Sequence, residues 1–192
     1  RTFEEYETEY DGLSKTEIKI PLFGIDGLDQ HLYEQYFAAN EVLPDYEDVN
    51  PTKDTSEFSY VDSRMYHDYH QHGRFVTVLM NSYLYEGGVN GMYFTRNINY
   101  DLEKERPFEL RDLLNAKNIS LERLDELVKE KLKGDNYKGA LFPDYESNLD
   151  SPALDYQVFY ATDYELTIIF NIYQIGPRSS GTLVVSIPWE EF

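Results

Sequence analysis

Two short glycine-containing turns enclose the apolar segment RFVTVLMNSYLY, residues 74–85, and this arrangement limits the possible folds more than any other feature. The turn before the segment is HQHG (residues 70–73). The turn after it, EGGVNG (residues 86–91), leads into the alternating segment MYFTRNINYDL. Strands joined by such short turns form hairpins and pair in antiparallel fashion. We therefore expect neighbouring antiparallel strands over residues 58–69, 74–85 and 92–102.

Other segments show the periodicity of a strand or a helix. The run KTEIKIPLF (residues 15–23) alternates like a strand, and a helix is expected over residues 28–40. The segment SLERLDELVKEKLKG has the clearest helical apolar face, with Ser120 as its N-cap and Gly134 at its end. Three strands are expected near the end of the chain, over residues 156–160, 164–173 and 182–187. The last two are joined by GPRSSG (residues 176–181).

Residues 43–57 are acidic and interrupted by proline, which predicts a long solvated loop. Four of its side chains could in principle bind calcium, but their spacing does not fit an EF-hand loop, which needs a glycine in its middle. These four are Asp45, Glu47, Asp48 and Asn50.

The charge of the chain disfavours several classes of partner. The 192 residues carry a net charge of −19, from 36 acidic and 17 basic side chains. Such a field repels nucleic acids, anionic membranes and anionic wall polymers, whereas a basic protein would be attracted. The alternative is that the acidic surface only keeps the protein in solution.

Cysteine is absent, which excludes disulfides, thiolate metal sites and thiol catalysis. No stretch is apolar for long enough to span a bilayer, so this segment should not insert into a membrane. Because the first residue is Arg1 and not methionine, we expect a processed or truncated chain whose signal peptide or anchor would precede it.

The run YHDYHQHGR holds three of the four histidines, namely His67, His70 and His72. It is the closest approach to a metal motif in the chain. Alternation along a strand places His67 and His70 on opposite faces, and His70 and His72 flank a turn completed by Gly73. We therefore interpret the run as a hairpin turn and expect no metal and no cofactor.

Catalytic motifs are also missing from the sequence. The glycines of EGGVNG are not followed by the lysine and the helix of a phosphate-binding loop, and no Ser-His-Asp spacing is present. We expect the chain not to be an enzyme. A hydrolase that uses two of the many carboxylates is the alternative from a different class.

Three stretches, in this order, carry a resemblance to a known family: SYLYEGGVNGMYFTRNINYDL, RPFELRDLL and YELTIIFNIYQIGPRSSGTLVVSIPWEEF. They resemble the C-terminal domain of RsiV-like anti-sigma factor ectodomains, a module that also occurs in peptidoglycan deacetylases such as PdaC and in uncharacterised bacterial envelope proteins. The preceding EIKIPLF segment and its helix resemble the smaller domain that usually comes before this module.

The resemblance implies an α+β fold, in agreement with the elements expected from the residues. Antiparallel sheets would carry helices packed on one face, and two small subdomains would form one compact body. The implied division places a smaller α+β subdomain at residues 1–73 and the RsiV-like domain at residues 74–192.

Two turns depart from the family pattern. The family commonly has Gly-Gly-Ala-His-Gly where this chain has GGVNG, residues 87–91, so a histidine of that turn is absent. After the Gly-Pro turn many members carry an aromatic or small residue, whereas this chain has Arg178. The metal-binding deacetylase domain and the sigma-binding segment with its membrane helix are not present in this sequence.

The family context implies an extracytoplasmic, ligand-binding sensor domain, and in the best understood relatives the ligand is lysozyme, a basic protein. The expected contacts lie in two glycine-rich turns, because protruding loops with tyrosine and arginine often anchor protein partners. They are Tyr173, Gly176, Pro177, Arg178, Ser179, Ser180 and Gly181, together with Glu86, Gly87, Gly88 and Asn90. The alternatives are that both are plain hairpin turns, or that the chain is a glycan-binding accessory domain of a wall-modifying protein.

Overall fold

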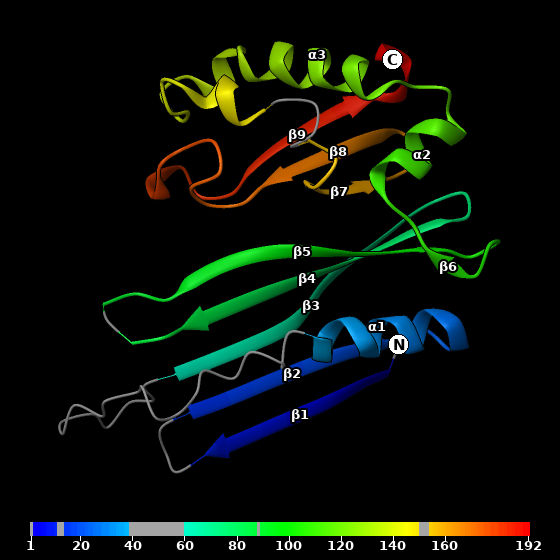
Figure 1. Cartoon of the computed structure of the whole chain (residues 1–192), viewed down its shortest axis with the longest axis vertical. Coiled ribbons are helices and arrows are strands. Elements are labelled where there is room, and N and C mark those ends of the chain that lie inside the picture. Colours follow the sequence, from blue (N-terminus) through cyan, green and yellow to red (C-terminus); the bar gives the residue numbers. More distant parts are fainter. Residues whose placement is uncertain (1, 11–13, 39–59, 88, 150–153) are drawn as a thin grey trace. The chain divides into compact units, whose positions relative to one another are not determined.

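The protein is described by a computed structural model, which defines residues 2–10, 14–38, 60–87, 89–149 and 154–192 (Figure 1). It contains a six-stranded sheet with the order β1-β2-β3-β4-β5-β6, a three-stranded sheet with the order β7-β8-β9, and helices α1, α2 and α3. The α+β class is therefore confirmed. The acidic loop expected over residues 43–57 lies outside the described residues.

The chain divides into two compact units that are not continuous in sequence. The first unit contains residues 1–68 and 79–98, and the second contains residues 69–78 and 99–192. Strands β3, β4 and β5 therefore contribute residues to both units. The expected subdomain boundary after residue 73 stays a prediction.

The first unit is built on long strands and one helix. Asp29 fixes the start of the helix, because its carboxylate accepts hydrogen bonds from the Phe23 and Gly24 N–H groups, each at 2.8 Å. The core lies between β2 and α1, where Ile20, Leu28 and Leu32 are fully buried. The elements that lie wholly or partly in this unit are β1 (Thr2–Tyr10), β2 (Ser14–Leu22), α1 (Asp26–Ala38), β3 (Tyr60–His72), β4 (Phe75–Tyr85) and β5 (Met92–Asp101).

The pairing of β2 with β3 differs from the expected antiparallel pattern. These strands are parallel, with a register that runs from Ser14 opposite Tyr60 to Lys19 opposite Met65. The chain between them contains α1, and a parallel neighbour requires a crossover of this kind rather than a tight turn. The hairpin of β3 and β4 is confirmed, with Gly73 in the left-handed region (φ 55°).

A buried ion pair lies inside the first unit. The Arg64 guanidinium donates to both carboxylate oxygens of Asp62 and to the Tyr36 carbonyl oxygen, the last at 2.5 Å. Arg64 is 3% exposed and Asp62 is 8% exposed. Each charge is therefore stabilised mainly by the other, because little water reaches either of them.

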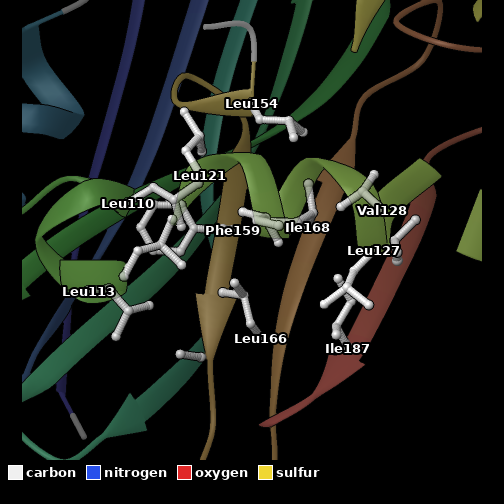
Figure 2. Packing of buried hydrophobic residues seen from close by; sticks show 14 of the residues in the cluster. Leu110, Leu113, Leu121, Leu127, Val128, Leu154, Phe159, Leu166, Ile168 and Ile187 are labelled. Atoms are coloured by element: carbon white, nitrogen blue, oxygen red, sulfur yellow. The ribbon is translucent and has the colours of Figure 1, made fainter. Parts of the chain in front are cut away.

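The second unit places a helix over a three-stranded antiparallel sheet. Helix α3 begins as expected, with the Ser120 hydroxyl accepting from the Arg123 N–H at 3.1 Å. Figure 2 shows Leu127 and Val128 of α3 above the sheet, on the side where Ile168 and Ile187 are buried. The elements of this unit are β6 (Arg106–Pro107), α2 (Leu110–Ala116), α3 (Leu121–Leu132), β7 (Val158–Ala161), β8 (Glu165–Phe170) and β9 (Leu183–Pro188).

Neither α2 nor β1 was expected from the sequence. Helix α2 is short and begins where the Asp112 carboxylate accepts from the Glu109 N–H at 3.0 Å, a bond that lowers the pKa of Asp112. Within the described ranges, strand β1 pairs with β2 alone. In the part of the chain that the structure describes, no helix has the length and apolar character needed to cross a bilayer.

Candidate functional site

The loop between β8 and β9, residues 171–182, holds seven of the residues expected to contact a partner. It is not a simple hairpin turn, because β8 ends at Phe170 and residues Arg178–Ser180 form a short 3-10 helix. The strand expected to reach Tyr173 therefore ends earlier. The cause is local: the Asn171 N–H donates to the Gln174 side-chain oxygen at 2.5 Å, which turns the chain.

Contacts with residues 140–142 hold this loop in place. The Ser180 hydroxyl donates to the Ala140 carbonyl oxygen at 2.8 Å, and the Phe142 N–H donates to the Ile175 carbonyl oxygen at 2.9 Å. Gly176 lies so close that a Cβ atom there would be 2.2 Å from the Ala140 oxygen. The backbone of the loop is therefore fixed from both sides of Gly176.

The loop exposes only some of its predicted contact residues. Tyr173, Arg178 and Ser179 are exposed, and Tyr173 leaves 51% of its surface open to solvent. Gly176 is buried, so it shapes the loop and offers no surface to a partner. The remaining three, Pro177, Ser180 and Gly181, are half-buried.

Tyr173 also has a backbone conformation that is uncommon for a tyrosine. Its φ of 69° lies in the left-handed region, where a side chain with a Cβ atom is strained. Strain of this kind persists only where the surroundings enforce it, and it is often found at functional sites. The loop thus holds an exposed aromatic ring on a fixed, strained backbone.

The EGGVNG turn belongs to the first unit, between β4 and β5. Of its predicted contact residues, Glu86, Gly87 and Asn90 are exposed, and Gly88 lies outside the described residues. Gly87 has a φ of 89°, which this tight turn requires and which other residues rarely adopt.

Apolar side chains at the same turn are exposed as well, and they were not predicted as contacts. Val89 is 95% exposed, Met92 47% and Tyr93 63%. The Tyr93 ring packs against Tyr83 at a centroid distance of 4.5 Å. Gly91 leaves room for the Tyr83 ring, because a Cβ atom at Gly91 would lie 2.3 Å from that ring. An alternation pattern could not distinguish these exposed side chains from buried ones.

Two of the three histidines of the hairpin, His70 and His72, pack within the second unit, whereas His67 is exposed and belongs to the first. The His70 ring stacks on Tyr160 at a centroid distance of 3.7 Å, and the His72 ring stacks on Trp189 at 5.1 Å. His72 Nδ1 lies 3.1 Å from a carboxylate oxygen of Asp163. Among the described residues, no group of three or more histidine, cysteine or acidic side chains could hold a metal ion.

Trp189 is the centre of this cluster. Its indole N–H donates to the Thr162 carbonyl oxygen at 2.8 Å, and the Lys117 ammonium lies 4.3 Å from its ring. The ring also packs against Phe192. These contacts join residues far apart in sequence, and nothing in the local pattern around the histidines could have revealed them.

Part of the chain matches a known family. Residues 111–190 match the model of the family described as Protein of unknown function (DUF3298). No curated protein matches the sequence.

Two solved structures share the fold. A DUF3298 family protein from Pseudomonas aeruginosa aligns with a TM-score of 0.64 and 19% sequence identity, over 100% of this chain and 90% of that one. A DUF3298 family member from Bacteroides fragilis aligns with a TM-score of 0.58 and 19% identity, over 98% of this chain and 90% of that one.

Proposed function

We propose that this chain, whose residues 111–190 match the DUF3298 family model, is a binding module that recognises a basic protein through its β8–β9 loop. The observation that carries the proposal is the half-exposed Tyr173 ring, held on a left-handed backbone by a loop that residues 140–142 fix in place. A rigid aromatic side chain loses little entropy when a partner covers it, which makes it a suitable anchor.

The charge of the chain supports a basic partner. A net charge of −19 attracts a positively charged protein and raises its association rate at low salt. The resemblance to RsiV-like ectodomains suggests lysozyme as this partner and an extracytoplasmic, non-catalytic sensor as the role. The EGGVNG turn, with its exposed Val89, Met92 and Tyr93, is a second contact surface in this proposal.

Titration calorimetry with lysozyme at low and at physiological salt tests the proposal. Truncation of an anchor commonly costs about 1–3 kcal/mol, so Tyr173→Ala should weaken binding by about tenfold or more. Arg178→Ala should weaken it as well. The matched control is Tyr164→Ala, which removes a tyrosine that is 84% exposed in the same unit but outside the loop.

The outcomes separate a specific site from general charge attraction. Binding at physiological salt that weakens with Tyr173→Ala and not with Tyr164→Ala supports the proposal. Binding only at low salt, with equal effects of both variants, would show charge attraction without a site. Absence of binding at either salt would discard lysozyme as the partner.

A cell-wall glycan is the second candidate ligand, because two tyrosines of the second unit are almost completely exposed. Tyr156 is 87% exposed and Tyr164 is 84% exposed, and such rings can stack on sugars. The single tryptophan does not offer this, since His72 and Lys117 cover its ring. Co-sedimentation with purified wall polymer, compared for the parent chain and Tyr156→Ala, tests this candidate.

A further inference from the structure

Strand β9 forms one edge of the three-stranded sheet and, among the residues that the structure describes, pairs only with β8 (Figure 1). The direction of its backbone groups follows from the register, in which Pro188 lies opposite Glu165. Just beyond this pair, the Trp189 N–H donates to the Tyr164 carbonyl oxygen at 3.0 Å. Along an antiparallel strand, successive residues direct their N–H and C=O groups alternately towards and away from the neighbouring strand. The N–H and C=O groups of Val184 and Ser186 therefore point away from β8.

Two further observations agree with this direction. The Tyr137 hydroxyl donates to the Val184 carbonyl oxygen at 2.6 Å, which it could not reach if that oxygen faced β8. Pro188 lacks an N–H group and occupies an outward-facing position, as prolines in edge strands do. The Ser186 N–H and C=O and the Val184 N–H are thus directed at the outer side of the sheet.

A hollow of about 520 Å³ lies along this edge. Val184 and Ser186 form one wall, and Val184 is 43% exposed. The end of α3 and the residues after it form the other wall, through Glu130, Lys131, Gly134, Asn136 and Tyr137. A strand edge that faces a trough can accept an additional strand from another chain.

The charges around the hollow select the kind of strand. The Lys131 ammonium is paired with the Glu191 carboxylate at 2.7 Å, which offsets its charge. Glu130 is exposed at the wall of the hollow, and the chain as a whole carries a net charge of −19. With the Lys131 charge offset, Glu130 is the remaining charged side chain among the residues that line the hollow, and it favours a segment with lysine or arginine side chains.

We propose that the edge of β9 binds an extended basic peptide segment, which adds a strand beside Val184 and Ser186 and places a cationic side chain next to Glu130. A second copy of this chain is a less suitable occupant, because two chains that each carry a net charge of −19 repel each other. Tyr173 is not among the residues that line this hollow, so the proposal goes beyond the proposed binding function.

The probe for this proposal is a capped synthetic peptide of alternating lysine and valine, roughly as long as β9. We expect it to shift the amide resonances of Val184 and Ser186 in a nitrogen–proton correlation spectrum and to slow hydrogen exchange of the Ser186 amide. Val184→Pro removes an outward N–H without removing a bond to β8, and should weaken binding about tenfold. Val184→Thr, which keeps the N–H, is its control.

The charge contribution has its own pair of variants. Glu130→Gln should weaken binding about two- to fivefold, the range expected for an exposed ion pair. Glu122→Gln removes the same charge from α3 outside the hollow and should leave the affinity close to that of the parent chain. Tyr173→Ala should also leave peptide binding unchanged, so failure of the lysozyme proposal and failure of this one are distinguishable.

Three results would overturn the proposal. The first is equal affinity of the peptide for Val184→Pro and Val184→Thr. The second is a set of shifted resonances that excludes Val184 and Ser186. The third is a concentration-dependent dimer of the parent chain that Val184→Pro dissociates, which would assign the edge to a second copy.

Discussion

Replacement of Gly176 by alanine tests whether the β8–β9 loop is held as tightly as its contacts indicate. The added Cβ atom would lie 2.2 Å from the Ala140 carbonyl oxygen and 3.3 Å from a methyl carbon of Leu183. The first distance is far below van der Waals contact, and the opposing atom belongs to the backbone. The two segments must therefore move apart by about 1 Å.

Separation on this scale has a cost that the contacts allow us to work out. Overpacking in a fixed environment costs about 1–3 kcal/mol. The hydrogen bonds from Ser180 to Ala140 and from Phe142 to Ile175 would also lengthen, and each contributes about 1 kcal/mol. We expect Gly176→Ala to lower the free energy of unfolding by about 2–4 kcal/mol.

Urea unfolding followed by tryptophan fluorescence measures this change, because Trp189 is the single tryptophan and belongs to the second unit. Two controls separate the contributions. Gly139→Ala adds a methyl group in open space on a left-handed backbone (φ 78°) and should cost about 1–2 kcal/mol. Ser180→Ala removes one hydrogen bond and should cost about 1 kcal/mol. If Gly176→Ala is no more destabilising than these controls, the loop is not held as described.

Three further predictions concern other parts of the chain. Asp62→Asn leaves the buried Arg64 charge without its counter-charge and should lower the midpoint of thermal unfolding by an amount that corresponds to about 3–5 kcal/mol. Burial raises the pKa of Tyr36 in the folded protein. The stability that this shift contributes is therefore complete below the ordinary pKa of 10.0 and is lost as the pH rises above that value. In urea unfolding, raising the pH above this value should lower the free energy of unfolding less in Tyr36→Phe than in the parent chain. His70→Ala removes a stacked ring and should cost about 0.5–1.5 kcal/mol in the same assay, whereas the exposed His67→Ala should change stability by less than about 0.5 kcal/mol.

Local patterns in the sequence were sufficient to predict most of the helices and strands. Alternation located β2, β4 and β5, and helical spacing with a serine cap located α3. Strand β1 was missed because TFEEYETEY is polar on both faces, as an edge strand with little burial can be. Helix α2 is too short to show a helical period, although Glu109 and Asp112 stand at the spacing of an N-terminal cap.

The parts of the site that depend on distant contacts could not be predicted. The parallel pairing of β2 with β3 is set by a crossover, and alternation does not report strand direction. Hydrophobic periodicity does not predict contacts between residues far apart in sequence. It therefore could not predict that Gly176 lies against Ala140. Nor could it predict the contacts of His72 with Asp163 and Trp189. The sequence did identify Tyr173 as a surface side chain but not the left-handed backbone that makes it unusual.

The division of the chain into units that interrupt one another determines how it can be separated into parts. Residues 69–78 lie between segments of the first unit, yet their histidines stack on Tyr160 and Trp189 of the second. A gene fragment that starts at residue 111, where the family match begins, would lack this hairpin and leave those two aromatic rings uncovered. A protease that digests the first unit would likewise destroy β3 and β4 and remove the hairpin from the second. Inheritance, recombination and degradation should therefore act on the two units together.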